Sequence, residues 1–201
     1  MHSNAKLIFA RYAAPYFSEA SRVLEIGPDT HPSTLSTLVP TQQEWHTLDI
    51  VNRADDLTYV TSDPYAFPIE DGRYDIVLSS QVIEHVERIW LWMKEVVRVT
   101  RPGGMVITIA PVSWPHHEGP EYGDCWRMYP AGLSALCEDS GLFVESSHWG
   151  SLETPPPRRV VPGRSQEWLS RRGQRVSRVM ELLGLPVERG FDTIVVGRKP
   201  A

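Results

Sequence analysis

The chain has 201 residues, of which 41% are hydrophobic and 22% are charged, and its formal net charge at pH 7 is −5. This size and composition suit one globular domain with a substantial core, whereas a general nucleic-acid binder would carry a basic surface. No apolar run reaches the roughly 18 residues of a membrane span, and the amino terminus lacks a secretory signal. The two cysteines match no metal-binding spacing and are expected to be reduced thiols. We therefore expect a cytoplasmic protein.

The first predicted element is an amphipathic helix over residues 4–19. Its apolar and aromatic side chains recur at helical spacing and would cover one face of a sheet. Packing in the core is the ordinary role of such a face. The alternative is that Tyr12 or Tyr16 contributes to a binding site.

A buried parallel strand is predicted at residues 23–26, because three of its four residues are apolar and Gly27 follows. Ligands of open α/β sheets bind beyond the carboxyl ends of strands, where glycine lets the backbone come close. The second strand, residues 45–49, ends in Asp49, 22 residues beyond Gly27. Nucleotide-binding α/β units place the acid that binds ribose hydroxyls at this distance, so Asp49 is the predicted ribose ligand.

A third unit follows at residues 63–68, and two more buried strands are predicted at residues 74–80 and 105–110. Between these strands, residues 82–100 have helical spacing and are expected to form a scaffold helix. The remaining predicted elements are a capped helix start at residues 32–35, a helix over residues 131–140 and strands over residues 142–147 and 191–197.

These segments resemble, in order and spacing, the class I S-adenosylmethionine-dependent methyltransferases over residues 20–145. The resemblance is carried by VLEIG, the acid of LDIV, SDPYAFP, YDIVLSSQVIEHV and VTRPGGMVITIAP. It implies an α/β, Rossmann-like fold: a seven-stranded, mostly parallel sheet with an antiparallel last strand inserted beside the fifth, and helices on both faces. It also implies S-adenosyl-L-methionine as the cofactor.

The resemblance also assigns cofactor contacts. Glu25 sits where the family fixes the methionine end, and Ser80 lies in the segment that holds the methionine amino group. Asp63 matches the acid that accepts a hydrogen bond from the adenine amino group, although an Asp before proline is also a common turn former. A main-chain donor to the adenine ring would come from Tyr65. Of the family's glycine loop only Gly27 is present, so fewer backbone donors are offered.

The least ordinary stretch is residues 111–130, a long loop rich in His, Trp and acidic residues. Its end, with the pattern D-x-W-R-x-x-P-x-G-L, is similar to small methyltransferases encoded among sugar and polysaccharide biosynthesis enzymes. Those proteins also tend to carry a histidine upstream, for which His117 is the better match and His116 the fallback. A solvated surface loop is the plain alternative.

Methyl transfer to a hydroxyl explains why a histidine would be needed here. The hydroxyl must lose its proton as the new bond forms, and a histidine near neutral pKa is suited to accept it. His85 is a further candidate, although it is more often a packing residue. Asp124, Glu118 or Glu121 would hold the base in the useful tautomer. Alternatively, these three acids bind Mg²⁺, which polarises the hydroxyl.

We therefore expect a single methyltransferase domain over residues 1–201, with residues 111–130 and 150–190 as acceptor-side loop and lid insertions. Residues 167–185 carry an arginine-rich helical pattern that forms a lid, a homodimer contact or simply a solvated face.

The expected reaction is O-methylation of a saccharide or another polyhydroxylated small molecule, with a small-molecule or oligosaccharide acceptor. The alternatives are N- or carboxyl-methylation of a secondary metabolite, or cofactor binding without catalysis. A nicotinamide-dependent oxidoreductase would need GxGxxG after the first strand, which the sequence lacks.

Overall fold

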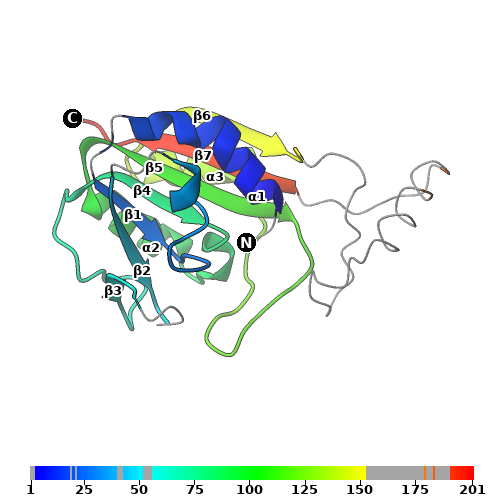
Figure 1. The fold of residues 1–201 in the computed structure, drawn as a ribbon, viewed down its shortest axis with the longest axis horizontal. Coiled ribbons are helices and arrows are strands. Elements are labelled where there is room, and N and C mark those ends of the chain that lie inside the picture. Colours follow the sequence, from blue (N-terminus) through cyan, green and yellow to red (C-terminus); the bar gives the residue numbers. More distant parts are fainter. Residues whose placement is uncertain are drawn as a thin grey trace.

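The computed structural model describes residues 3–18, 20, 22–39, 43–51, 56–152, 179, 183 and 191–201. Within these residues the chain builds one seven-stranded sheet, in the order β3-β2-β1-β4-β5-β7-β6 (Figure 1). The strands are β1 (Arg22–Ile26), β2 (Glu44–Asp49), β3 (Tyr59–Val60), β4 (Tyr74–Ser80), β5 (Thr100–Ser113), β6 (Phe143–Gly150) and β7 (Phe191–Arg198).

The topology confirms the predicted fold. Strands β1 to β5 pair in parallel, whereas β7 lies between β5 and β6 and is antiparallel to both. The order of the strands reverses between β1 and β4, and at such a switch point the carboxyl ends of neighbouring strands open a crevice. A ligand site is therefore expected beyond β1 and β4.

Helices cover both faces of the sheet (Figure 1). On one face, α2 (Ile89–Val99) and α3 (Pro130–Asp139) pack on one set of strand side chains. On the other face lies α1 (Ser3–Ile8), which continues as a π-helical turn and a 3₁₀ turn to residue 18. Because successive strand residues point to opposite faces and both faces are covered, the central strands β1, β4, β5 and β7 are buried over most of their length, whereas the edge strand β6 is not.

The predicted helix over residues 82–100 is shorter than expected. Residues 83–85 form a single 3₁₀ turn, and the α-helix begins only at Ile89. The carbonyl oxygen of Glu84, which a continuous helix would use within itself, accepts hydrogen bonds from the backbone N–H groups of Cys125 and Trp126 at 2.7 and 3.2 Å. The loop after β5 therefore interrupts this helix.

The segment after β1 also differs from expectation. A capped helix start was predicted at residues 32–35, but the chain forms only a 3₁₀ turn, Ser36–Leu38, in which the Ser33 hydroxyl accepts the Ser36 N–H at 3.1 Å. The strand β5 continues to Ser113, so the loop predicted at residues 111–130 covers residues 114–129. The predicted lid at residues 150–190 lies outside the described residues except at 150–152, 179 and 183.

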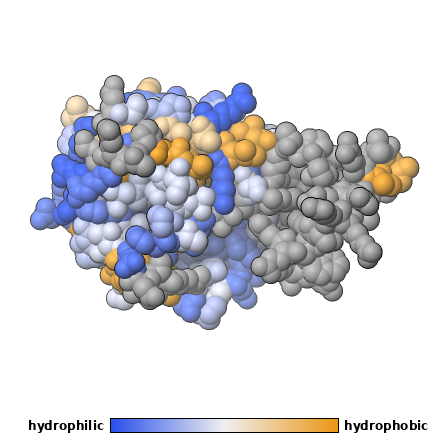
Figure 2. All heavy atoms as spheres, viewed as in Figure 1, coloured by the Kyte–Doolittle hydropathy of each residue, from blue (hydrophilic) through white to orange (hydrophobic). Residues whose placement is uncertain are grey.

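The described surface is polar over most of the face that Figure 2 shows, with apolar atoms in small patches. No helix within the described ranges is long and apolar enough to cross a membrane. The apolar residues are instead divided between two buried clusters, one on each side of the sheet.

Candidate functional site

A cavity of about 1170 Å³ opens at the carboxyl ends of β1, β2 and β4. On one side its wall is formed by the ends of these strands, with Gly27, Asp49 and Ser80. On the other side lie His85 and residues of the loop after β5, including His117. Pockets for one small ligand usually measure about 300–1,000 Å³, so this cavity has room for a cofactor and a second molecule.

Gly27 forms the part of the wall where the backbone itself faces the cavity. Its φ angle is 69°, a conformation that glycine adopts without strain, and its N–H donates to the Leu48 carbonyl at 2.9 Å. A Cβ at this position would lie 2.4 Å from Cγ2 of Val82. Both the backbone conformation and the close packing therefore require glycine.

The two acids predicted to bind the nucleoside lie at this end of the cavity. Asp49 lines it, and one of its carboxylate oxygens accepts the Ile50 N–H at 2.6 Å. Asp63 is exposed and does not line the cavity itself, but both of its chain neighbours do. The Asp63 carboxylate accepts the Tyr65 N–H at 2.8 Å, so the main-chain donor expected to face an adenine ring is already bonded within the chain.

Glu25 and Ser80, the two residues expected near a methionine moiety, have different surroundings. Glu25 is buried outside the cavity wall, and its carboxylate accepts the Trp45 indole N–H at 2.9 Å and a hydrogen bond from Ser33. Burial raises the pKa of Glu25 to about 7. Ser80 lines the cavity, and its buried hydroxyl has no partner among the described residues. That hydroxyl is therefore available to a ligand.

The loop after β5 brings His117 against His85. The two rings meet edge to face with centroids 4.8 Å apart, and the ring of Tyr122 lies 4.4 Å from that of His85. Nδ1 of His85 is 2.6 Å from the Gly123 carbonyl oxygen, which ties the loop to the end of β4. Burial lowers the pKa of His85, so its neutral form is favoured near pH 7.

Asp124 anchors this loop from within. Both of its carboxylate oxygens accept hydrogen bonds from the guanidinium of Arg127, and one also accepts the His117 N–H at 2.7 Å. Burial opposes the ionisation of Asp124, but these hydrogen bonds outweigh it and lower its pKa to about 2. The same carboxylate lies 3.4 Å from Nδ1 of His117. The structure thus brings the predicted base and the predicted orienting acid together.

The other predicted loop residues lie further out. The side chain of His116 is 69% exposed, faces Glu118 at 3.9 Å and does not line the cavity. Glu121 lines the cavity. Of the two adjacent histidines, His117 is therefore the one that faces the site.

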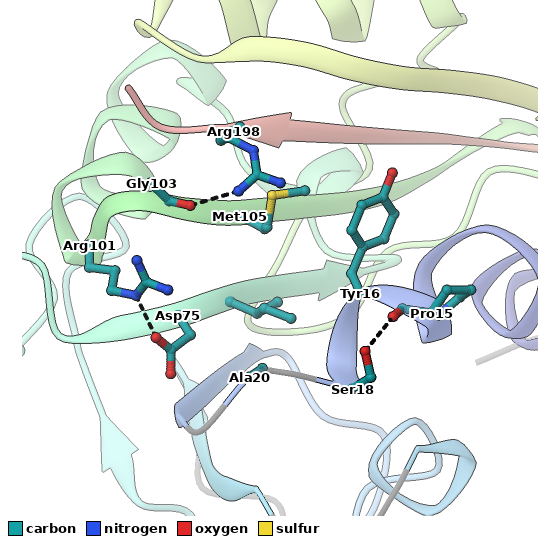
Figure 3. Close-up of a pocket in the computed structure, with 10 residues that line it drawn as sticks. Pro15, Tyr16, Ser18, Ala20, Asp75, Arg101, Gly103, Met105 and Arg198 are labelled. Atoms are coloured by element: carbon teal, nitrogen blue, oxygen red, sulfur yellow. Dashed lines mark hydrogen bonds and ion pairs between the residues drawn. The ribbon is translucent and has the colours of Figure 1, made fainter. Parts of the chain in front are cut away.

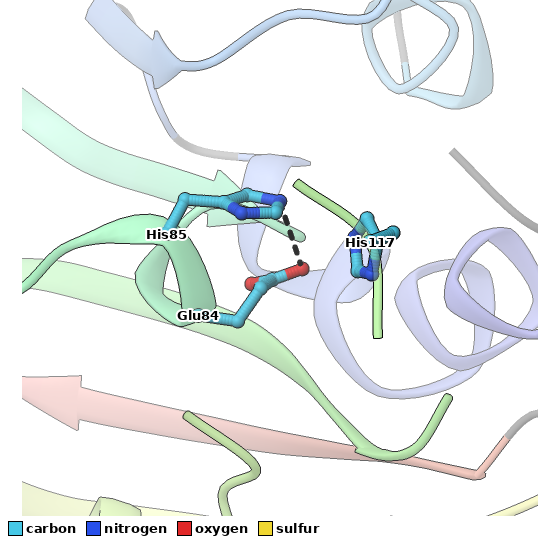
Figure 4. A group of neighbouring side chains, drawn as sticks. All are labelled: Glu84, His85 and His117. Carbon is cyan, nitrogen blue, oxygen red and sulfur yellow. Dashed lines mark ion pairs between the residues drawn. The ribbon is translucent and has the colours of Figure 1, made fainter. Parts of the chain in front are cut away.

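Sequence reasoning did not single out Glu84. Its side chain is 0% exposed, and neither carboxylate oxygen has a hydrogen-bond partner among the described residues. Burial raises the pKa of Glu84 to about 8. Its Oε1 lies 3.9 Å from Nε2 of His85, and Figure 4 shows the carboxylate pointing toward the histidines. The available signal was a carboxylate inside the apolar run VIEHV, where a core helix has no use for one.

A second cavity, of about 300 Å³, lies at the opposite ends of β4 and β5 (Figure 3). Two arginines line it, but Arg101 pairs with Asp75 and Arg198 with Glu145. With these charges neutralised inside the chain, this cavity offers less chemistry than the first.

Comparison with known proteins finds similarity to methyltransferases. Residues 26–108 match the family model of a methyltransferase domain. An uncharacterized methyltransferase of Mycobacterium avium is 44% identical over 96 residues, which are 48% of this chain and 33% of that protein. The match thus spans about a third of the length of that curated relative.

Solved structures share the fold. A SAM-dependent methyltransferase from Archaeoglobus fulgidus superposes with a TM-score of 0.61 at 19% identity, over 96% of this chain and 92% of that one. The Burkholderia thailandensis 1,6-didemethyltoxoflavin-N1-methyltransferase, with bound 1,6-didemethyltoxoflavin and S-adenosylhomocysteine, gives 0.62 at 12% identity, over 98% and 79% of the two chains. The sheet order and these likenesses show the fold of class I methyltransferases.

Proposed function

Because the chain carries a methyltransferase domain on the class I methyltransferase fold, we propose that it is an S-adenosyl-L-methionine-dependent methyltransferase acting on a hydroxyl group. The acceptor class is a saccharide or a similar polyhydroxylated small molecule. One observation carries the proposal: a single cavity of about 1170 Å³ joins strand-end residues suited to a nucleoside with a histidine pair suited to an acceptor.

The strand-end half of the cavity fits the cofactor. Its glycine wall lets a ligand approach the backbone, and the unpartnered hydroxyl of Ser80 faces the same space. Asp49 would accept hydrogen bonds from the ribose hydroxyls, since a carboxylate is an acceptor only. When bound, the cofactor would supply a methyl group on a positively charged sulfur. Of the predicted cofactor residues, those that line the cavity and are proposed to contact the cofactor are Gly27, Asp49, Tyr65 and Ser80. Asp63 lies between two lining residues, and Glu25 lies behind the wall.

The histidine half would handle the acceptor. Nδ1 of His117 lies 3.1 Å from the Pro115 carbonyl oxygen and 3.4 Å from the Asp124 carboxylate, so its proton belongs on Nδ1. The lone pair is then on Nε2, where it can accept the proton of a hydroxyl. The aromatic rings of Trp114 and Tyr122 also line the cavity and offer flat faces to a sugar ring.

The free thiols fit a reducing compartment. Cys125 is exposed and Cys137 is buried, and both are unpaired within the described residues. We propose the cytoplasm as the place of action, where thiols persist.

The test is to incubate the protein with methyl-labelled cofactor and a panel of saccharides, phenols and amines. We expect label in hydroxyl compounds, and His117→Ala should lower the rate by about 100-fold or more, the usual contribution of a general base. The matched control is His148→Ala, because His148 is an exposed histidine of β6 that stacks on Tyr12 away from the cavity.

Two outcomes would contradict the proposal at different levels. Label only in amines, with turnover unaffected by His117→Ala, would indicate an N-methyltransferase. No binding of S-adenosylmethionine in calorimetry at millimolar ligand would contradict the cofactor assignment itself.

A further inference from the structure

We propose that Glu84, His85 and His117 bind one divalent transition-metal ion at the wall of the acceptor half of the large cavity, which His85 and His117 line and behind which Glu84 is buried. Each of these residues offers one ligand atom, and the three atoms lie within 4.8 Å of one another (Figure 4). The role of this metal in catalysis rests on the function proposed above, whereas the binding of the metal does not.

Glu84 gives the strongest reason for a cation. Its carboxylate is completely buried, no other residue in the described part of the chain donates a hydrogen bond to it, and Nε2 of His85 lies 3.9 Å away. An unsatisfied buried polar group of this kind is destabilising, and more so if it is charged, so a side chain used only for packing would be apolar here. The nearby cation Arg127 favours the ionised form of Glu84 only through its charge, because the hydrogen bonds of its guanidinium go to Asp124 and to backbone carbonyl oxygens. A metal ion would satisfy Glu84.

The two histidines are arranged as metal ligands commonly are. Nδ1 of His85 faces the Gly123 carbonyl oxygen, and Nδ1 of His117 faces the Pro115 carbonyl oxygen and the Asp124 carboxylate. Acceptors at Nδ1 keep the proton there and leave the lone pair on Nε2, which is the usual outer-shell support of a metal-bound histidine. Arg127 donates a hydrogen bond to Asp124 and so holds the carboxylate that orients the His117 ring.

The ligand types select the metal. Two imidazoles with one carboxylate suit Mn²⁺, Fe²⁺, Co²⁺ or Zn²⁺, whereas Mg²⁺ and Ca²⁺ prefer oxygen ligands alone. This site differs from the Mg²⁺ site expected at Glu118, Glu121 and Asp124. Among the described residues, Glu118, Glu121 and Asp124 do not form a group with their ligand atoms close together. Asp124 is bonded to Arg127, and the side chain of Glu118 is 66% exposed.

The spacing requires the ligand atoms to move closer together. Tetrahedral ligands about 2.1 Å from one ion lie about 3.4 Å from one another, whereas these three atoms lie within 4.8 Å, so the side chains must close by up to about 1.4 Å. His117 belongs to a loop, and the loop supplies that adjustment more readily than the strand end does. Three protein ligands leave open positions toward the cavity, where one or two hydroxyl oxygens of the acceptor can bind.

A metal there would change how the hydroxyl is activated. A coordinated hydroxyl would have a lowered pKa and would release its proton to water in the cavity. Its oxygen would bond to the methyl carbon as the carbon–sulfur bond of the cofactor breaks, and the sulfur would keep that electron pair and leave as S-adenosylhomocysteine. Nε2 of His117 has a single lone pair, which holds either a proton or the metal. The metal-loaded protein therefore activates the acceptor by coordination, and the metal-free protein uses His117 as the base.

The test is a titration of the chelator-treated full-length protein with Co²⁺, followed by visible absorption and calorimetry. We expect one ion per chain and d–d bands that report nitrogen ligands. Glu84→Gln and His117→Ala should each weaken Co²⁺ binding about 100-fold or more, since even outer-shell changes cost about 10–100-fold. His116→Ala is the matched control, because it removes the adjacent, exposed histidine, and it should leave Co²⁺ affinity unchanged.

The same samples are then titrated with S-adenosylmethionine to separate the two proposals. The metal site is refuted if wild type and His117→Ala bind Co²⁺ with equal affinity, or if neither protein binds Co²⁺. If both proteins still bind S-adenosylmethionine equally, the methyltransferase proposal stands. Failure of the wild type to bind the cofactor would refute the proposed function and leave the Co²⁺ result to decide the metal site alone. The His117→Ala protein keeps this test valid even where Glu84→Gln does not fold.

Discussion

Replacing Gly27 by alanine tests the account of the cavity wall, because two separate effects can be measured at one position. The φ angle of 69° would cost an alanine about 1–2 kcal/mol. The new Cβ would also lie 2.4 Å from Cγ2 of Val82, and forcing a methyl group into a filled space costs about 1–3 kcal/mol. After the entropy that alanine removes from the unfolded chain, we expect Gly27→Ala to lower the free energy of unfolding by about 2–4 kcal/mol.

The steric part can be isolated with a second change. Val82→Ala removes the atom that the new Cβ would strike, so Gly27→Ala should cost less in the Val82→Ala background. The coupling energy of this double-mutant cycle should be about 1–3 kcal/mol, and the remaining cost reports the strained φ angle. Urea unfolding followed by circular dichroism provides the free energies, and calorimetry reports whether the folded variants still bind S-adenosylmethionine.

A matched glycine in a helix provides the control. Gly132 lies in α3, and a Cβ added there would meet no atom within 4 Å, so Gly132→Ala should stabilise the protein by about 0.5–1 kcal/mol. If Gly27→Ala unfolds at the same urea concentration as the wild type, or shows no coupling to Val82→Ala, the description of this turn is wrong.

Three more predictions concern charged groups of the cavity and its loop. The pKa of Glu84 is raised to about 8 from an ordinary 4.5, so as pH rises the unfolded chain loses this proton before the folded chain does. The free energy of unfolding of the metal-free protein should therefore fall between pH 4.5 and pH 8. Urea titrations at several pH values should show a weaker pH dependence for Glu84→Gln. Arg127→Ala leaves the Asp124 carboxylate, which is 1% exposed, without its cation, and should destabilise the protein by about 3 kcal/mol or more, with faster proteolysis in the loop. A proteolysis pattern identical to wild type would contradict that role. Asp49→Ala should weaken S-adenosylmethionine binding about tenfold in calorimetry with little change in melting temperature, and an unchanged affinity would remove Asp49 from the ribose site.

The sequence predicted most of the sheet because its signals are local. The apolar run ending at Gly27 and the acid at Asp49 lie on single strands, and their positions follow from the alternation of side chains and the turn after each strand. The antiparallel last strand was also predicted, through the resemblance to a family, and the pairing of β7 with β5 and β6 confirms it.

The start of α2 could not be predicted in the same way. Helical spacing extends back to residue 82, but the Glu84 carbonyl bonds to Cys125 and Trp126, which are about 40 residues further along the chain. A local pattern does not record a hydrogen bond to a distant loop. The same loop contact places the Glu84 side chain beside the site and not on the face of a helix.

What the sequence determined by itself was the course of the strands and the strand ends that line the large cavity, because hydrophobic periodicity and glycine turns act over a few residues. The class of fold followed from the resemblance of these segments to a family. Only the tertiary structure brought Glu84 and His85 together with His117, 32 positions later in the chain. That meeting depends on hydrogen bonds between the turn after β4 and the loop after β5, and on the burial that leaves the Glu84 carboxylate without a partner in the described residues.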